Sequence, residues 1–326
     1  MMRLPENARN LIWTDAEGEN RMGNNVNAPK PKKRKKIGSY VPYYVLLAPF
    51  LIAFITLTVL PILGSIFLSF TDFNMVQMPK WNGIGNYLRL FFQDDIFKID
   101  IKNTLLIAIV TGPTGYILSF VIAWFINEFG RKMRTFLTFI MYAPALCGNA
   151  FFLWTFIFSA DSGGLLNTLL SNLGLINDPI AWLSDTNYNM MVVMIVTIWN
   201  SFGVGFLSFR AGLQSLDSTY YEAAAIDGLR NRWQELYYVT FPQMGPQLLF
   251  GAVNAIAGAF GVGAINKALT GYPSTNYSTD TIVLHMQDHG NIRFEMGYAS
   301  TIAVVLFVMM VVTNYIVKKA LKRFTA

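Results

Sequence analysis

The segment Thr219-Tyr-Tyr-Glu-Ala-Ala-Ala-Ile-Asp-Gly-Leu-Arg-Asn-Arg-Trp-Gln-Glu-Leu-Tyr-Tyr-Val-Thr-Phe-Pro242 is a polar interruption in a very apolar chain. Its three consecutive alanines are strong helix formers, so we expect the segment to begin as a helix. Thr219 and Glu222 have the spacing of a capping box, while Asp217 is an alternative N-cap. The sequence therefore predicts a short helix here and leaves its first residue open.

Gly228 divides this segment, because glycine readily takes the left-handed conformation that ends a helix. A second short helix is expected from about Arg230 to Val239, and Pro242 would then stop it. Two short helices that meet at a glycine form a compact knob, which could fill a socket on a soluble partner if it lies between membrane spans. The alternative is an ordinary amphipathic helical hairpin.

The composition is that of a membrane protein, with 53% hydrophobic and only 13% charged residues among 326. Soluble domains average about 25% charged residues. Six uncharged stretches each exceed the roughly 20 residues that a helix needs to cross a bilayer. They predict an all-α membrane protein with six spans, at residues 43–71, 103–127, 135–160, 186–209, 243–266 and 296–317.

Residues 1–39 are polar and basic, and we expect a disordered tail ahead of a transmembrane domain at 40–326. The run Lys30-Pro-Lys-Lys-Arg-Lys-Lys36 favours an anchor beside anionic lipid over a nucleic-acid patch in a chain with many spans. With the N-terminus inside, the inner segments carry 19 Lys and Arg and the outer segments 6. The positive-inside rule then puts both termini and the loop 215–242 in the cytoplasm.

In this place, the polar segment resembles the EAA loop of the membrane subunits of ABC importers. The family pattern is Glu-Ala-Ala, three residues, Gly, and a hydrophobic residue shortly before Pro. The interval from Gly228 to Pro242 is one residue longer than that pattern, which leaves the register of the second helix open. Three outer motifs are similar to the carbohydrate-importer branch and extend the resemblance over residues 43–320: Trp81-Asn-Gly-Ile-Gly-Asn-Tyr87, Trp182-Leu-Ser-Asp185 and Met296-Gly-Tyr-Ala-Ser300.

The resemblance implies a permease subunit of a bacterial or archaeal cell membrane, with the last five helices as the shared core and a cytoplasmic coupling helix. It also implies a heterodimer with a second permease, two cytoplasmic ATP-binding subunits and an extracytoplasmic solute-binding protein. The chain itself would be no enzyme and hold no cofactor, since ATP and Mg²⁺ would bind the partner ATPase. The coupling residues that it implies are Glu222, Ala223, Ala224, Asp227, Gly228 and Pro242.

Enzyme chemistry finds little support in the residues. No Walker A sequence is present, and no nucleophile, base and orienting group form a recognisable set. His285-Met-Gln-Asp-His289 spaces two histidines one helical turn apart, as a zinc site could. It lacks the glutamate of a metalloprotease helix, so we expect hydrogen-bonded histidines and no metal site.

A sugar carries hydroxyl groups and no net charge, so its pathway needs neutral hydrogen-bonding groups and aromatic faces. No charged residue lies within the six stretches, which favours energy supplied by a partner over proton coupling. Glycine and proline interrupt several spans and favour a bent bundle around a cavity. The pathway candidates are Asn149, Trp154, Asn200 and Asn254, for which interhelical contact is the alternative role.

Three other functions stay open on the sequence. The first is an ABC permease for a charged or longer saccharide or another solute, for which Lys267 and Arg293 offer outer positive charge. The second is a secondary transporter, which the lack of charge within the spans disfavours. The third is a membrane scaffold without transport, which the helix breakers disfavour. The sequence names neither the sugar nor the permease subunit that holds it.

Overall fold

The computed structural model describes residues 41–148, 151–161 and 163–325. The predicted tail at 1–39 and the pathway candidate Asn149 lie outside these residues. The described chain forms two units, one ending at Leu60 and the other beginning at Pro61. In the first unit, α2 (Val41–Phe54) continues into a π-helical turn, η3 (Ile55–Val59). Its large apolar side chains are exposed, as expected of a helix whose natural solvent is lipid.

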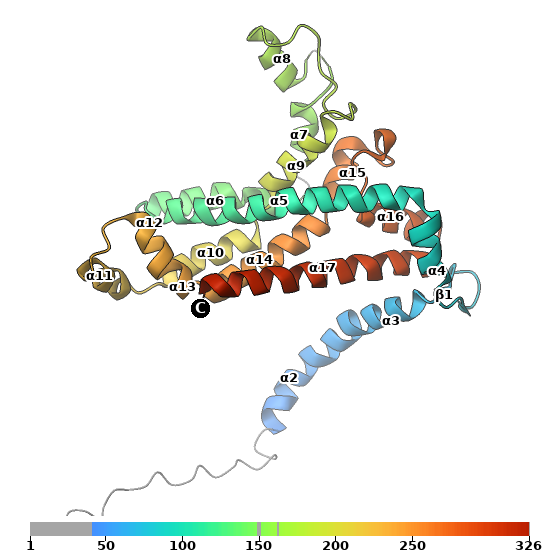
Figure 1. Cartoon of the computed structure of the whole chain (residues 1–326), viewed down its shortest axis with the longest axis horizontal. Helices are drawn as coiled ribbons and strands as arrows, with labels where there is room; N and C mark the ends of the chain where they lie inside the picture. Colours follow the sequence, from blue (N-terminus) through green and yellow to red (C-terminus); the bar gives the residue numbers. More distant parts are fainter. Residues whose placement is uncertain (1–40, 149–150, 162, 326) are drawn as a thin grey trace, which may run out of the picture. The chain divides into compact units, whose positions relative to one another are not determined.

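The second unit is a helical bundle. Its main helices are α5 (Asp95–Asn127), α9 (Asn189–Asn200), α10 (Val204–Ser215), α14 (Gly245–Phe260) and α17 (Met296–Thr325). Helix α5 packs against α9, α10 and α14, and α14 also packs against α10 and α17 (Figure 1). Three apolar clusters hold the bundle together, around Ile302, Phe206 and Val193.

The all-helical expectation is confirmed, since the described residues contain only one two-stranded hairpin, with β1 (Thr71–Asp72) paired antiparallel to β2 (Lys80–Trp81). The count of six spans is not confirmed. By length and apolar composition, four described helices could cross a membrane, and a bent pair would be a fifth. The four are Tyr43–Leu68, Asp95–Asn127, Asn189–Ser215 and Met296–Leu321, and the pair is α14 with α15 (Ala264–Thr270), bent by 41°.

The third expected span, 135–160, is divided into α6 (Arg131–Leu146) and α7 (Phe152–Ile157). Gly148 follows α6 with φ of +56°, and a left-handed residue cannot continue a right-handed helix. Two other boundaries differ from the expectation. Helix α5 begins at Asp95, eight residues before the expected span, and α10 continues past Phe209 to include the buried Arg210.

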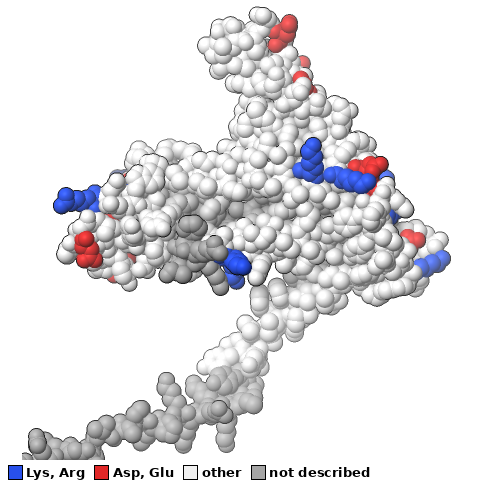
Figure 2. Space-filling view, in the orientation of Figure 1, with Lys and Arg blue, Asp and Glu red and all other residues white. Residues whose placement is uncertain are grey.

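The remaining elements are short. They are α3 (Leu60–Leu68), α4 (Gly85–Leu88), η4 (Arg89–Gln93), α8 (Leu165–Asn172), α11 (Ser218–Ile226), α12 (Arg232–Glu235), η5 (Leu236–Thr240), α13 (Phe241–Gln243), η6 (Thr275–Tyr277), α16 (Ile282–Gln287) and η7 (Asp288–Ile292). On the face drawn in Figure 2, charged side chains of the bundle lie near α11 and the end of α17, and again near α4, α15 and α16. The surface between these places is mostly uncharged, as a membrane-embedded surface must be.

Candidate functional site

Residues 217–243, here called the knob segment, follow α10 and precede α14. Asp217 caps its first helix, α11, because its carboxylate accepts a hydrogen bond from the Thr219 N–H at 3.0 Å. The sequence left the N-cap open between Asp217 and Thr219, and in the structure Asp217 is the N-cap. Glu222 lies one turn further on with an exposed side chain. Its carboxylate is thus available to a partner near the positive N-terminal end of α11.

Gly228 ends α11 in the way that the sequence predicts. Its φ is +95°, in the left-handed region. The Leu229 N–H donates to the Ala224 carbonyl at 3.0 Å, and the Gly228 N–H donates to the Ala225 carbonyl at 3.2 Å. These two bonds form a Schellman motif, which satisfies the last carbonyls of the helix. The turn between the two short helices is therefore fixed by the backbone.

The second helix of the knob segment differs from the expectation at both ends. It begins at Arg232, because Asn231 is its N-cap and forms a capping box with Gln234. It does not stop before Pro242 but continues through the π-helical turn η5 into α13, with Pro242 in the first turn of α13. The Phe241 N–H donates to the Leu236 carbonyl, five residues back. A π turn holds one residue more than an α turn, which accommodates the extra residue between Gly228 and Pro242.

The knob segment is tied to the C-terminal end of α5. Arg232 forms an ion pair with Glu128, the C-cap of α5, with a nitrogen–oxygen distance of 3.0 Å. The Trp233 ring lies 5.3 Å from the Trp124 ring, measured between centroids. Surface ion pairs contribute little by themselves, so we expect the aromatic contact to dominate this attachment.

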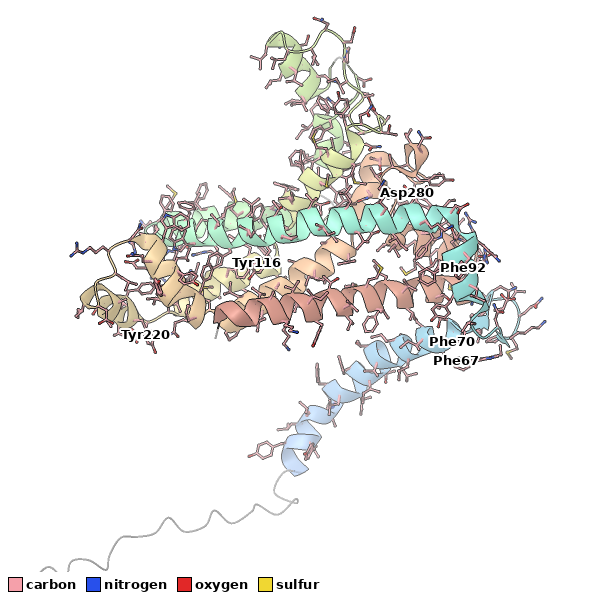
Figure 3. The ribbon with its side chains drawn as sticks, viewed as in Figure 1. Phe67, Phe70, Phe92, Tyr116, Tyr220 and Asp280 are labelled. Carbon is pink, nitrogen blue, oxygen red and sulfur yellow. The ribbon has the colours of Figure 1, made fainter. Side chains whose placement is uncertain are left out.

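Much of the knob surface faces away from the rest of the chain. Ile226 is 86% exposed, and Tyr220 is 51% exposed on α11 (Figure 3). Of the six coupling residues expected from the sequence, only Ala224 is buried. The other five are exposed: Glu222, Ala223, Asp227, Gly228 and Pro242. An ordinary hairpin would bury its large apolar side chains, so this exposure favours a docking surface.

A central cavity of about 480 Å³ lies within the bundle, lined by α5, α9, α10, α14 and α15. None of its described lining residues is Asp, Glu, Lys, Arg or His. Nine glycines contribute to the lining. At Gly258 an added Cβ would meet nothing within 4 Å. In α14, Gly251 instead lets the Phe209 ring of α10 pack closely, since an added Cβ there would clash with that ring.

Two of the expected pathway residues line the central cavity, Asn200 and Asn254. The Asn254 amide donates to the Phe250 carbonyl at 2.9 Å, which leaves its oxygen free to accept a hydrogen bond. Trp154 is not among the lining residues, since its ring packs against Trp199 and Phe158 at centroid distances of 5.4 and 5.7 Å. The structure thus brings together two of the three described candidates.

The sequence interpretation missed the other polar residues of the central cavity. They are Thr111, Tyr116, Ser119, Thr197 and Ser201, from α5, α9 and the residue that follows α9. Tyr116 lies on α5 and donates its hydroxyl hydrogen to the Leu248 carbonyl at 3.3 Å (Figure 3). The sequence does contain a signal for these residues: Tyr116 and Ser119 are three positions apart, and this spacing places both hydroxyl groups on one face of a helix.

An apolar helical bundle with an uncharged central cavity and an exposed knob at one end has the features of a membrane permease. The chain belongs to the family of binding-protein-dependent transport system inner membrane components, whose profile matches residues 113–325. The matched residues include the knob segment and most of the central cavity. This confirms the resemblance found in the sequence.

Curated relatives and a solved structure extend this assignment along the chain. The probable ABC transporter permease protein YesP of Bacillus subtilis (strain 168) is 30% identical, over 88% of this chain and 92% of its own length. The lactose transport system permease protein LacF of Rhizobium radiobacter is 27% identical, over 78% of this chain and 86% of its own. One chain of the bacterial alginate ABC transporter, in complex with alginate pentasaccharide-bound periplasmic protein, has a TM-score of 0.73 at 24% identity. That likeness covers 89% of this chain and 97% of the other, and it shows a shared fold.

Proposed function

We propose that this chain is a membrane-spanning subunit of an ATP-driven importer for a neutral sugar or oligosaccharide. The observation that carries this proposal is the central cavity, whose described lining offers amide, hydroxyl and aromatic groups but no charge. Such a lining matches the hydroxyl groups of a sugar without a fixed charge that would trap an ion. The similarity to a lactose transport permease supports the same substrate class.

The knob segment is the proposed coupling element. Its exposed surface would enter a socket on a cytoplasmic ATPase subunit, and ATP and Mg²⁺ would bind in that partner. Closure of two such ATPases would move α11 and α12, and the contacts of Trp233 and Arg232 would carry this motion to the end of α5. Because α5 also lines the central cavity, the motion could open it alternately to the two sides.

The proposed assembly contains a second permease subunit and an extracytoplasmic solute-binding protein. The relative that crystallised with a periplasmic protein supports the latter. In this arrangement the knob segment faces the cytoplasm, together with both termini. The end of the bundle that carries α4 and α16 then faces outward. The excess of Lys and Arg in the inner segments supports that orientation.

Reconstitution of the complex in proteoliposomes tests the proposal. Sugar uptake should require ATP and the solute-binding protein, and it should survive a protonophore that collapses the proton gradient. Uptake that persists without ATP and stops with the protonophore would show a secondary transporter instead.

A second candidate substrate is an acidic saccharide, because the shared fold includes an alginate transporter. The described lining of the central cavity offers no cation to pair with a uronate carboxylate, so we rank this substrate lower. Competition of uptake by neutral and acidic oligosaccharides of equal length would separate the two.

A further inference from the structure

Two histidines and three carboxylates meet at the end of the bundle opposite the knob segment. We call this the His–Asp cluster, and its members are Asp94, Asp100, His285, His289 and Glu295. Both histidines are 2% exposed and Asp100 is fully buried. Asp94 and His285 lie 191 positions apart in sequence, so this grouping is a product of the fold. No member of the cluster belongs to the knob segment or lines the central cavity.

Local structure positions Asp94 and the two histidines of the cluster. Asp94 is the N-cap of α5 and accepts a hydrogen bond from the Phe97 N–H at 2.9 Å. Helix α16 carries His285, and the π turn η7 carries His289 four residues later. The two imidazole rings therefore lie next to each other, with centroids 4.7 Å apart and planes tilted by 53°.

The contacts of the two rings have the pattern of metal-binding histidines. His285 Nδ1 lies 3.1 Å from Asp100 Oδ2, and His289 Nδ1 lies 2.8 Å from Glu295 Oε2. Metal-binding histidines usually have one ring nitrogen oriented by a carboxylate while the other binds the ion. His285 Nε2 lies 3.0 Å from Asp94 Oδ2, and one ligand atom each from Asp94, His285 and His289 lie within 4.8 Å of one another.

Unsatisfied polar atoms mark the same place. His285 Nδ1 and both carboxylate oxygens of Asp100 are buried without a hydrogen-bond partner among the described residues. The 3.1 Å approach between these two side chains is thus not aligned as a hydrogen bond. A buried carboxylate without hydrogen bonds costs free energy, which a nearby cation would offset.

The charges around the cluster also favour a cation. Aspartate and glutamate side chains here outnumber arginines, since Asp280 and Asp288 add to the three carboxylates while Arg89 and Arg293 are the neighbouring basic groups. A cavity of about 500 Å³ borders the cluster and is lined by Asp94, His285 and His289. The cavity gives an ion and its remaining water ligands a route to the site.

We propose that Asp94, His285 and His289 form a binding site for a divalent transition-metal ion of the zinc class. Ligands about 2.0–2.1 Å from a tetrahedral zinc ion lie roughly 3.3 Å from one another, close to the His285–Asp94 separation. The three ligand atoms already lie within 4.8 Å of one another, so small side-chain movements would bring them to this spacing. Glu295 orients the His289 imidazole, Asp100 places a negative charge beside His285 Nδ1, and water from the cavity completes the coordination. The sequence spacing alone had favoured hydrogen-bonded histidines without a metal.

A bound ion would join elements that are far apart in the chain. Asp94 begins α5, whereas His285 and His289 belong to α16 and η7. The ion would therefore hold the start of α5 against the segment that precedes α17. The alternative occupant is a proton, which would make His285 an imidazolium between two carboxylates.

Metal titration of the full-length chain in lipid nanodiscs, after chelator treatment, tests the site directly. Co²⁺ should bind at one ion per chain, give the visible absorption bands of a four- or five-coordinate nitrogen and oxygen site, and be displaced by Zn²⁺. His289→Gln and Asp94→Asn should each weaken binding by at least about tenfold. Asp95→Asn is the matched control, because that neighbouring carboxylate is exposed and pairs with Lys98. It should bind as tightly as the wild type.

Glu295→Gln provides a second variant that keeps all three ligands. It should retain the absorption bands and weaken binding by about 10–100-fold, the effect expected of an orienting carboxylate. Circular dichroism should show the same helix content in every variant. Absence of the Co²⁺ bands in the folded wild type, or undiminished binding by a His285→Gln, His289→Gln double variant, would overturn the proposal. The titration contains no sugar, so it is independent of the transport function.

Discussion

Gly228 shows how one backbone conformation sets the shape of the knob segment. Its left-handed φ completes the Schellman motif that turns the chain from α11 towards α12. An added Cβ there would meet nothing within 4 Å, so a substitution acts through backbone strain and not through a clash. The sequence predicted this turn because glycine near the end of a helix is a local signal.

Gly228→Val should reduce sugar transport and ATPase binding while leaving the membrane helices assembled. The left-handed conformation costs a residue with a side chain roughly 1–2 kcal/mol, which favours a different turn and a displaced α11. Gly174→Val is the matched control, since Gly174 also has a left-handed φ and open space around it but lies outside the knob segment. Equal ATPase co-purification and uptake in the two variants would refute a coupling role for this turn.

The protonation of His285 sets the pH dependence of the proposed metal site. Burial alone lowers the pKa of His285, but the carboxylates of Asp100 and Asp94 outweigh this and raise it to about 9. Burial lowers the pKa of His289, which is therefore neutral at pH 7. Hydrogen bonds from His285 and Tyr298 outweigh the effect of burial on Asp94 and hold its pKa well below the usual value.

Metal binding below pH 9 must therefore displace one proton, from His285. The affinity for Co²⁺ should rise about tenfold for each pH unit between roughly pH 6 and 8, because protons compete less at higher pH. Titrations at several pH values measure this slope. A slope of zero would show that His285 is not a ligand, and a slope of two would show that His289 is protonated as well.

At the scale of elements, hydropathy located the long helices but not their ends. The sequence places the start of one span at residue 103, yet α5 begins at Asp95 because Asp94 caps it. The first turns of α5 contain four charged residues, so the predicted span, which was drawn as an uncharged stretch, left these turns out. One of the four, Asp100, is nevertheless fully buried. Burial of a carboxylate depends on partners distant in sequence, which periodicity cannot reveal. The break after α6 was missed because the run around Gly148 carries no charge and is long enough to span a bilayer as one helix.

The central cavity was only partly predictable for a related reason. Asn200 and Asn254 were found because amides are rare in apolar stretches. Trp154 was chosen because an aromatic ring can bind a sugar, but its ring packs against Trp199 instead. Whether a side chain lines the cavity or packs against a neighbouring side chain depends on the rotation of its helix, which the sequence does not show. Hydroxyl residues such as Thr111 and Ser201 satisfy carbonyls of their own helix, so they are common in spans without lining a cavity.

Asn254→Leu in α14 should weaken sugar transport by about 3–10-fold, the effect of losing one hydrogen bond worth roughly 0.5–1.5 kcal/mol. The loss should appear in the sugar concentration needed for half-maximal uptake. Asn314→Leu in α17 is the matched control, because its amide also bonds the carbonyl four residues back, at 2.9 Å, but Asn314 is outside the cavity lining. Unchanged kinetics in the Asn254 variant would remove that residue from the sugar pathway.

On the scale of the whole bundle, α5 connects the three polar features. Its N-cap Asp94 contacts His285, its middle lines the central cavity, and its C-cap Glu128 pairs with Arg232 of the knob segment. A continuous helix of 33 residues is roughly 50 Å long, enough to span a bilayer with both ends in water. The His–Asp cluster and the knob segment should therefore lie on opposite sides of the membrane.

Cysteine labelling of intact cells tests this orientation, with the native Cys147 first replaced by serine because it is exposed. Asp178 and Asp227 are both exposed, the first in the chain after α8 and the second at the end of α11. A membrane-impermeant maleimide should label Asp178→Cys in intact cells, and it should label Asp227→Cys only after the membrane is permeabilised. The excess of Lys and Arg on the knob side is the physical reason, since basic segments are retained in the cytoplasm. Labelling in the reverse order would place the knob segment outside, where no ATPase could reach it, and the coupling role would fall with it.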